Sequence, residues 1–232
     1  VDRAEKVVAG IARACSECGC ALLGGETAEL PGFYAAGEYD LAGFAVGVIE
    51  RDEVIDGRTV VAGDVLVGVA SSGLHSNGYS LVRRIVEAGK LELSRPAPGF
   101  DRPLGDVLLE PTRLYPPLVA ALRAKVTLKA VSHITGGGLL ENPPRVIPDG
   151  LRLRFRRGSW PEPPIFDLLR RTGEVPEPEM LRTFNLGVGL VLALAPAEAD
   201  VAIATLAERG VGAWKVGEVL GGAGGERVVF EA

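Results

Sequence analysis

Short, strongly apolar runs alternate along the chain with amphipathic segments, and this alternation limits the possible folds more than any other feature. Residues 64–70 (DVLVGVA) and 183–195 (TFNLGVGLVLALA) are typical of buried strands, whereas residues 79–88 and 196–210 have the apolar spacing of helices. Short connections join these segments. The alternation predicts an α/β fold, or an α+β fold in which helices are layered on a sheet.

Further elements follow from the same patterns. Strands are predicted over 126–133 and 151–158, the second one exposed, and the carboxyl-terminal residues 214–220 and 226–232 are predicted to pair as a hairpin. A helix is predicted over 111–125, with the two adjacent prolines near its start. A second is predicted over 138–147, where Pro143 and Pro144 cut it short, and a third over 166–173.

The composition supports a buried core and excludes some partners. Apolar residues make up 47% of the 232 residues and charged residues 24%, with a net charge of −5. Such a chain has no basic face for nucleic acid. No apolar run approaches the roughly 18 residues of a membrane span, and no signal peptide opens the chain. We expect a soluble cytoplasmic protein with neither nucleic-acid nor membrane partners.

The three cysteines, Cys15, Cys18 and Cys20, lie in one patch with the spacing C-x2-C-x-C. A metal site needs a fourth ligand, and no second cysteine pair or histidine lies nearby in the sequence. Burial of Cys15 and Cys18 on a helix stripe and of Cys20 at the start of a buried strand is the favoured interpretation. We therefore predict no metal site in this chain.

A change in composition indicates a domain boundary. Residues 51–64 are charged and carry two turn signals, which divides the chain into parts 1–55 and 56–232. The first part is predicted to contain one helix and two strands, over 2–18, 20–23 and 39–49. These elements are too few to close a core, which indicates the tail of a larger domain.

Four polar, glycine-rich loops are the candidate binding segments: 24–32 (GGETAELPG), 71–78 (SSGLHSNG), 133–138 (HITGGG) and 183–189 (TFNLGVG). The first three follow predicted strands, and the second and third lead into predicted helices, where backbone N–H groups can meet an anion. None carries the G-K-[ST] of a phosphate-binding P-loop or a G-x-G-x-x-G before a helix. Each loop alone is better explained as a turn than as a binding segment.

Both histidines of the chain, His75 and His133, lie in these loops. The imidazole pKa near neutrality suits proton transfer, so a functional role is favoured over a structural one. Glu26 and Glu29 are better explained as solvated carboxylates than as magnesium or ribose contacts. The residues alone predict a phosphate-handling α/β protein.

Several blocks together resemble the phosphoribosylformylglycinamidine cyclo-ligase (AIR synthetase) family: GGETAELPGFY, DLAGF-VGVIE, SSGLHSNGYSLVR, PTR-Y, HITGGG--ENPPRV-P, RTFNLGVG and W-VGEV. Their order and spacing match over essentially the whole chain. GGETAELPGFY is the most discriminating block, since selenophosphate synthetase and thiamine-monophosphate kinase share the glycine pair but differ after it.

The resemblance implies an enzyme of de novo purine biosynthesis that uses ATP and magnesium to close the imidazole ring of formylglycinamidine ribotide, through a phosphorylated amide. It implies two domains of the AIR-synthetase superfamily and a homodimer. Residues 1–55 would be the carboxyl-terminal part of an ATP-binding and dimerisation domain, which is incomplete, and residues 56–232 the carboxyl-terminal α/β domain. Relative to that family the chain lacks an amino-terminal segment with a phosphate loop and the aspartates expected to hold magnesium. This difference argues against activity of the chain by itself.

The resemblance also implies roles for the loop residues. His75 and His133 are the predicted catalytic pair, one of them assisting proton removal from the attacking nitrogen. The predicted nucleotide-binding residues are Gly24, Gly25, Glu26 and Thr27. The predicted phosphate- or substrate-binding residues are Ser72, Gly73, Ser76, Asn77, Thr135, Gly136, Gly137 and Asn185. A noncatalytic nucleotide- or phosphate-binding module and another ATP-dependent enzyme of the superfamily remain as alternatives.

Overall fold

A computed structural model describes residues 2–35, 37–222 and 224–231 of the chain. The chain divides into two compact units, Val1–Val54 and Ile55–Ala232. Residues 1–55 are predicted to be a portion of an ATP-binding and dimerisation domain, and residues 56–232 a carboxyl-terminal domain. Both functions stay predictions.

The first unit contains the predicted helix but not the predicted strands. Helix α1 spans Asp2–Glu17 and is followed by Gly19 in the left-handed conformation, while a 3₁₀ helix, η1, spans Arg51–Glu53. The strands predicted over 20–23 and 39–49 are wrong, because the described residues of these segments are irregular and exposed. A strand needs a hydrogen-bonded neighbour, and no strand is found in the described part of this unit.

The cysteine patch belongs to the same unit. Cys15 and Cys18 are half-buried, and Cys20 is exposed rather than placed at the start of a buried strand. Within the described ranges, no cluster of three or more histidine, cysteine, aspartate or glutamate side chains is placed to hold a metal ion. Desolvation by the surrounding protein atoms raises the pKa of Cys15, and the neighbouring thiols of Cys20 and Cys18 raise it further. A raised pKa disfavours the reactive thiolate form.

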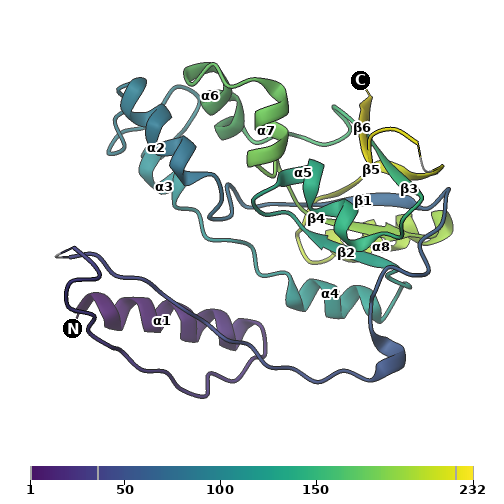
Figure 1. The fold of residues 1–232 in the computed structure, drawn as a ribbon, viewed down its shortest axis with the longest axis horizontal. Helices are drawn as coiled ribbons and strands as arrows, with labels where there is room; N and C mark the ends of the chain where they lie inside the picture. The colour runs from purple at the N-terminus through teal and green to yellow at the C-terminus, as the bar shows by residue number, and fades with distance from the viewer. Residues whose placement is uncertain (1, 36, 223, 232) are drawn as a thin grey trace. The chain divides into compact units, whose positions relative to one another are not determined.

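The second unit is built on a six-stranded sheet with the order β2-β4-β1-β5-β3-β6 (Figure 1). Every neighbouring pair is antiparallel except β3 and β6. The fold is therefore α+β rather than a parallel α/β sheet. The strands are β1 (Val65–Ala70), β2 (Ala130–His133), β3 (Leu151–Arg156), β4 (Val188–Leu194), β5 (Ala213–Gly221) and β6 (Val228–Glu231).

Helices and 3₁₀ turns connect these strands. The longer helices predicted from periodicity are confirmed, whereas α3 and α7 were not predicted. As expected, α4 has its adjacent prolines in the first turn. No helix in the described part of the chain has the length and apolarity to cross a membrane. The helical elements are α2 (Tyr79–Ala88), α3 (Leu104–Leu108), α4 (Pro116–Arg123), α5 (Gly138–Glu141), η2 (Pro143–Val146), α6 (Pro164–Thr172), α7 (Glu177–Thr183), η3 (Pro196–Glu198) and α8 (Ala199–Ala207).

The two faces of the sheet are buried against different helices. Leu190, Leu192 and Leu194 of β4 pack in one core cluster with residues of α4 and α8 (Figure 1). Val191 and Ala193 point to the opposite face and pack with residues of α5 and β3. This alternation is why β4 is apolar at every position. Helices α2, α3, α6 and α7 form a third cluster beside the sheet.

The predicted hairpin of the carboxyl terminus is wrong, because β3 lies between β5 and β6. Phe155 of β3 is paired with Gly217 of β5 on one side and with Phe230 of β6 on the other. A Cβ on Gly217 would lie 1.9 Å from the carbonyl oxygen of Arg154, so glycine permits this close pairing. The Phe155 and Phe230 rings stack with centroids 5.5 Å apart.

Candidate functional site

Three of the four predicted loops meet at one edge of the sheet. Strands β1 and β2 both run antiparallel to β4, which lies between them. The carboxyl ends of β1 and β2 therefore meet the amino end of β4: Ala70 is paired with Val188, and His133 with Leu190. The loops that follow β1 and β2 and the loop that precedes β4 are thus neighbours.

Two asparagine side chains connect these loops. Asn185 is buried, donates from Nδ2 to the Gly73 carbonyl oxygen at 2.8 Å and accepts the Gly187 N–H at 2.9 Å. Asn77 accepts the Gly136 N–H at 3.0 Å. Both asparagines hold the loops together, and their predicted contact with a phosphate stays a prediction.

The loop after β2 uses its backbone donors inside the protein. Asn142 accepts the Thr135 N–H at 2.7 Å and donates to the Gly136 carbonyl oxygen at 3.2 Å. The Gly137 N–H donates to the Arg182 carbonyl oxygen at 3.0 Å. Since the Gly136 N–H is bonded to Asn77, this loop offers a ligand the Thr135 side chain rather than these main-chain donors.

The remaining predicted residues lie in different surroundings. Gly73 is buried, Ser72 is half-buried, and Ser76 is exposed with a left-handed φ of +59°. Residues 24–27, the predicted nucleotide-binding segment, are irregular and exposed in the first unit. The strand predicted to precede that segment is absent, and its role stays a prediction.

Three aromatic rings form the centre of the site. His75, Tyr115 and His133 have ring centroids 5.7 to 6.4 Å apart. Gly189 of β4 lies directly against two of them, because a Cβ there would be 1.8 Å from the Tyr115 hydroxyl and 2.7 Å from His75 Cε1. The Tyr115 hydroxyl donates to the Ala70 carbonyl oxygen at 2.9 Å. A glycine at 189 is thus required for the rings to approach the sheet.

His75 is held as a neutral imidazole. It is 3% exposed and has a left-handed φ of +58°. Its Nε2 accepts the Ser72 N–H at 2.9 Å and faces the Arg113 N–H at 3.4 Å. Two donors at Nε2 place the ring hydrogen on Nδ1, which is buried without a partner among the described residues. Burial, His133 and Arg113 lower the pKa of His75 to about 4.

The other two rings of the cluster, His133 and Tyr115, are also neutral near pH 7. His133 is exposed, and the protein atoms packed around its ring lower its pKa from the ordinary histidine value. Burial raises the pKa of Tyr115. Near pH 7 all three rings are therefore neutral, and His133 is the more accessible proton acceptor of the two histidines.

Sequence reasoning did not include Arg113 and Tyr115 among the site residues. Both lie in the PTR-Y block, which contributed to the family resemblance but received no role. The Arg113 N–H reaches His75 across 38 positions of the sequence, and only the folded chain brings the two together. The available signal is the block itself, which places an arginine and a tyrosine at the start of the helix predicted over 111–125.

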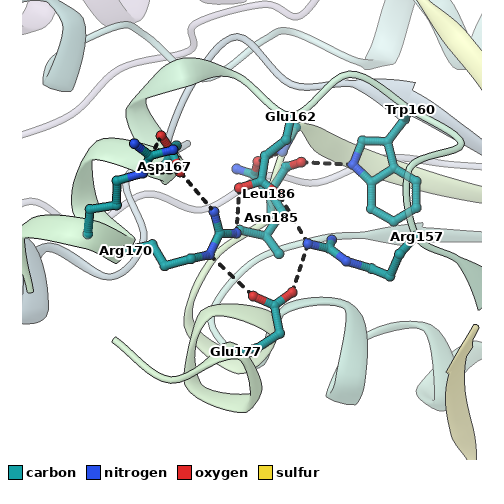
Figure 2. Close-up of polar contacts among 10 residues, drawn as sticks. Arg157, Trp160, Glu162, Asp167, Arg170, Glu177, Asn185 and Leu186 are labelled. Atoms are coloured by element: carbon teal, nitrogen blue, oxygen red, sulfur yellow. Dashed lines mark hydrogen bonds and ion pairs between the residues drawn. The ribbon is translucent and has the colours of Figure 1, made fainter. Parts of the chain in front are cut away.

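A closed ring of ion pairs supports the loop before β4 (Figure 2). Arg157 contacts Glu162 at 3.2 Å and Glu177 at 2.7 Å. Arg170 contacts the same two carboxylates at 2.6 Å and 3.2 Å. Each arginine therefore bridges both glutamates. Both arginines and Glu162 are partly buried, whereas Glu177 is exposed.

Trp160 connects this ion-pair ring to the loop. The Arg157 guanidinium lies 5.5 Å from the Trp160 ring centroid, and Trp160 Nε1 donates to the Leu186 carbonyl oxygen at 2.9 Å. Figure 2 shows this bond beside Asn185, which holds Gly73 of the loop after β1. The ion-pair ring is thus connected through Trp160 to the loop before β4.

Glu162→Gln is expected to lower the free energy of unfolding by about 1–2 kcal/mol, because Arg157 then keeps only Glu177, and Arg170 keeps Glu177 and a longer contact of 3.8 Å with Asp167. Urea denaturation of the chain measures this change, and high salt should reduce it. Glu92→Gln breaks an isolated exposed pair with Arg95 and is the control, with an expected change of about 0–0.5 kcal/mol. Equal effects of the two substitutions would contradict a stabilising ring.

Comparison with known proteins gives consistent matches along the chain. The family model for the carboxyl-terminal domain of AIR synthase related proteins matches residues 61–230, and the model for the amino-terminal domain matches residues 1–49. A phosphoribosylformylglycinamidine cyclo-ligase of Myxococcus xanthus is 53% identical over 100% of this chain and 67% of its own length. The relative from Geobacillus kaustophilus is 54% identical over 96% of this chain and 65% of its own length. The chain thus spans about two thirds of the length of these relatives.

Solved structures show the same fold at low identity. The hydrogenase maturation protein HypE of Escherichia coli has a TM-score of 0.52 and 22% identity, covering 75% of this chain and 48% of its own. Thiamine-monophosphate kinase of Stenotrophomonas maltophilia has a TM-score of 0.50 and 18% identity, covering 79% of this chain and 54% of its own. At such identities only the fold is shared.

Proposed function

The chain belongs to the AIR synthase related protein family, and we propose that the protein carrying it is a phosphoribosylformylglycinamidine cyclo-ligase. This enzyme would close the imidazole ring of formylglycinamidine ribotide to give aminoimidazole ribotide, with ATP as the second substrate. The observation that carries the proposal is the 53% identity to a protein of that name along the whole chain.

The proposed reaction has two steps. The γ-phosphoryl group of ATP is transferred to the formyl amide oxygen, which converts a poor leaving group into a good one and releases ADP. The amidine nitrogen then attacks the activated carbon, a C–N bond forms, and the C–O bond breaks with release of phosphate. The attacking nitrogen loses a proton, which a protein base accepts.

The geometry of the site supports separate roles for the two histidines. We assign proton acceptance to His133, because its ring is exposed and neutral. His75 is a hydrogen-bond donor in this scheme, since its Nε2 already faces two backbone N–H groups and its Nδ1–H has no described protein partner. A fixed donor of this kind can hold an anionic phosphate oxygen without reorganisation during the reaction. Ser72 and Ser76 lie in the same loop and supply further hydroxyls.

No magnesium site is assigned to the residues that the structure describes. The ion prefers carboxylate and phosphate oxygens in octahedral geometry, and the described residues contain no cluster of three or more candidate ligands. No step is therefore assigned to a metal held by this chain. ATP contact by residues 24–27 and assembly as a homodimer remain parts of the proposal that follow from the family alone.

Calorimetry of the purified chain with formylglycinamidine ribotide and, separately, with ATP tests the proposal. A cyclo-ligase portion is expected to bind the ribotide, and the complete protein to convert it with consumption of ATP. A noncatalytic nucleotide-binding module would bind ATP without ring closure by the complete protein. Binding of neither the ribotide nor any analogue of it would contradict the assignment of this unit as the ribotide side of the enzyme.

A further inference from the structure

Arg113 is a partly buried arginine without a counter-charge. Its Nε atom is buried and has no hydrogen-bond partner, and no carboxylate forms an ion pair with it within residues 2–35, 37–222 and 224–231. Arg154 and Arg227 also have a buried Nε atom without a hydrogen-bond partner, but each has a carboxylate beside its guanidinium: Glu218 at 2.6 Å for Arg154 and Asp149 at 3.1 Å for Arg227. Arg113 differs from these two arginines in lacking a carboxylate partner among the described residues.

Burial of an unpaired guanidinium is unfavourable. Removing part of a charge from water costs free energy that a carboxylate or hydrogen-bond acceptor normally offsets. Arginine also keeps its proton under all ordinary conditions, so it cannot avoid this cost by becoming neutral. A position of this kind is explained if an anion supplied from outside the chain is the missing partner.

A second unpartnered donor belongs to His75, whose ring faces the Arg113 main chain through its other nitrogen and is close enough to the Arg113 charge for that charge to lower the His75 pKa. The Arg113 backbone N–H faces His75 Nε2 at 3.4 Å, and Ser72 Oγ joins the two segments by donating to the Pro111 carbonyl oxygen at 2.6 Å. His75 Nδ1 is buried, 3% of the residue being exposed, and has no partner in the described protein. The buried Ser71 hydroxyl, next in the chain to Ser72, also has no partner.

We propose that Arg113 is an anion-binding residue of this site, and that its guanidinium, together with His75 Nδ1–H, holds a phosphate group of the bound substrate. Arginine presents planar, paired donors that match phosphate oxygens, and a neutral imidazole N–H adds a donor without a second full charge. The assignment of that phosphate to the ribotide rests on the proposed function. The phosphate chemistry rests on Arg113 and His75 alone.

Binding measurements on Arg113 variants test the proposal. Calorimetry with the ribotide is expected to give a dissociation constant about 10–100-fold higher for Arg113→Gln, since a charge-assisted hydrogen bond is lost. Arg113→Lys keeps the charge but loses the paired donors, so its loss should be smaller. Stabilisation of the chain against heat by inorganic phosphate, compared with sodium chloride at equal ionic strength, should decrease in the same order.

Arg84→Gln is the matched control, because Arg84 is an exposed arginine of α2. It should bind phosphate and ribotide as the unchanged chain does. The anion site would be overturned if Arg113→Gln bound ribotide and phosphate as tightly as the unchanged chain. It would also be overturned if phosphate did not stabilise the unchanged chain against heat. If the chain bound phosphate through Arg113 but did not bind the ribotide, the anion site would be upheld and the proposed function contradicted.

Discussion

Replacing His133 with alanine in the complete enzyme is expected to lower kcat/KM for ring closure by about 10²–10⁴-fold. His133 is the exposed, neutral member of the ring cluster and lies within 6.4 Å of His75, centroid to centroid. Its removal leaves the attacking nitrogen to lose its proton to water. Steady-state kinetics with formylglycinamidine ribotide and saturating ATP measure the effect.

The pH profile separates a base from a structural residue. Since the pKa of His133 lies below its ordinary value of about 6.5, the neutral form dominates at pH 7. The rate of the unchanged enzyme should therefore fall as the pH is lowered through that pKa, and His133→Ala should lose this acid limb. Val131→Ala, on the same strand, is the control and should keep both rate and profile. If His133→Ala stays within a few-fold of the unchanged enzyme, the proton-acceptor role of His133 fails.

The elements that the sequence predicts well are those whose pattern is local. Strand β4 is recognisable because both of its faces are buried, so Leu190 to Leu194 are all apolar. Helix α2 is recognisable from Val82 and Ile85, which are spaced to lie on one buried face. Neither pattern depends on which strand or helix is the neighbour.

Pairing between distant segments is what the sequence did not predict. Strands β5 and β6 are adjacent in the chain and resemble a hairpin, but β3 pairs with both of them. Arg154 of β3 forms ion pairs with Glu218 and Glu231 of the two neighbours. Alternating charged and apolar residues indicated an exposed strand, whereas the charged residues of β3 pair across the sheet instead.

The candidate site shows the same division. The composition and position of the loops predicted His75, Asn77 and Asn185 as residues of one site. In the structure, the order of β1, β4 and β2 brings their loops together. Arg113 and Tyr115 were missed because neither belongs to a glycine-rich loop. Their importance follows from contacts with His75 that link residues far apart in sequence.

Gly189→Ala is expected to lower the free energy of unfolding by about 3 kcal/mol, at the upper end for a residue that overfills a packed region. The added Cβ would lie 1.8 Å from the Tyr115 hydroxyl and 2.7 Å from His75 Cε1. The Tyr115 side chain must then move away from Ala70, whose carbonyl oxygen accepts its hydrogen bond. Urea denaturation measures the loss, and ribotide binding should weaken with it because the rings are displaced.

A double-mutant cycle identifies the hydroxyl as the source of the clash. Tyr115→Phe removes the atom nearest the new methyl group, so Gly189→Ala should cost less in that background than in the unchanged chain. Gly221→Ala, at the end of β5, is the control, because its Cβ would meet only the Ala62 methyl group at an ordinary 3.5 Å. If the cycle shows no coupling, the Tyr115 hydroxyl is not the source of the cost. If Gly221→Ala is equally destabilising, the cost at position 189 comes from the strand backbone and not from the ring cluster.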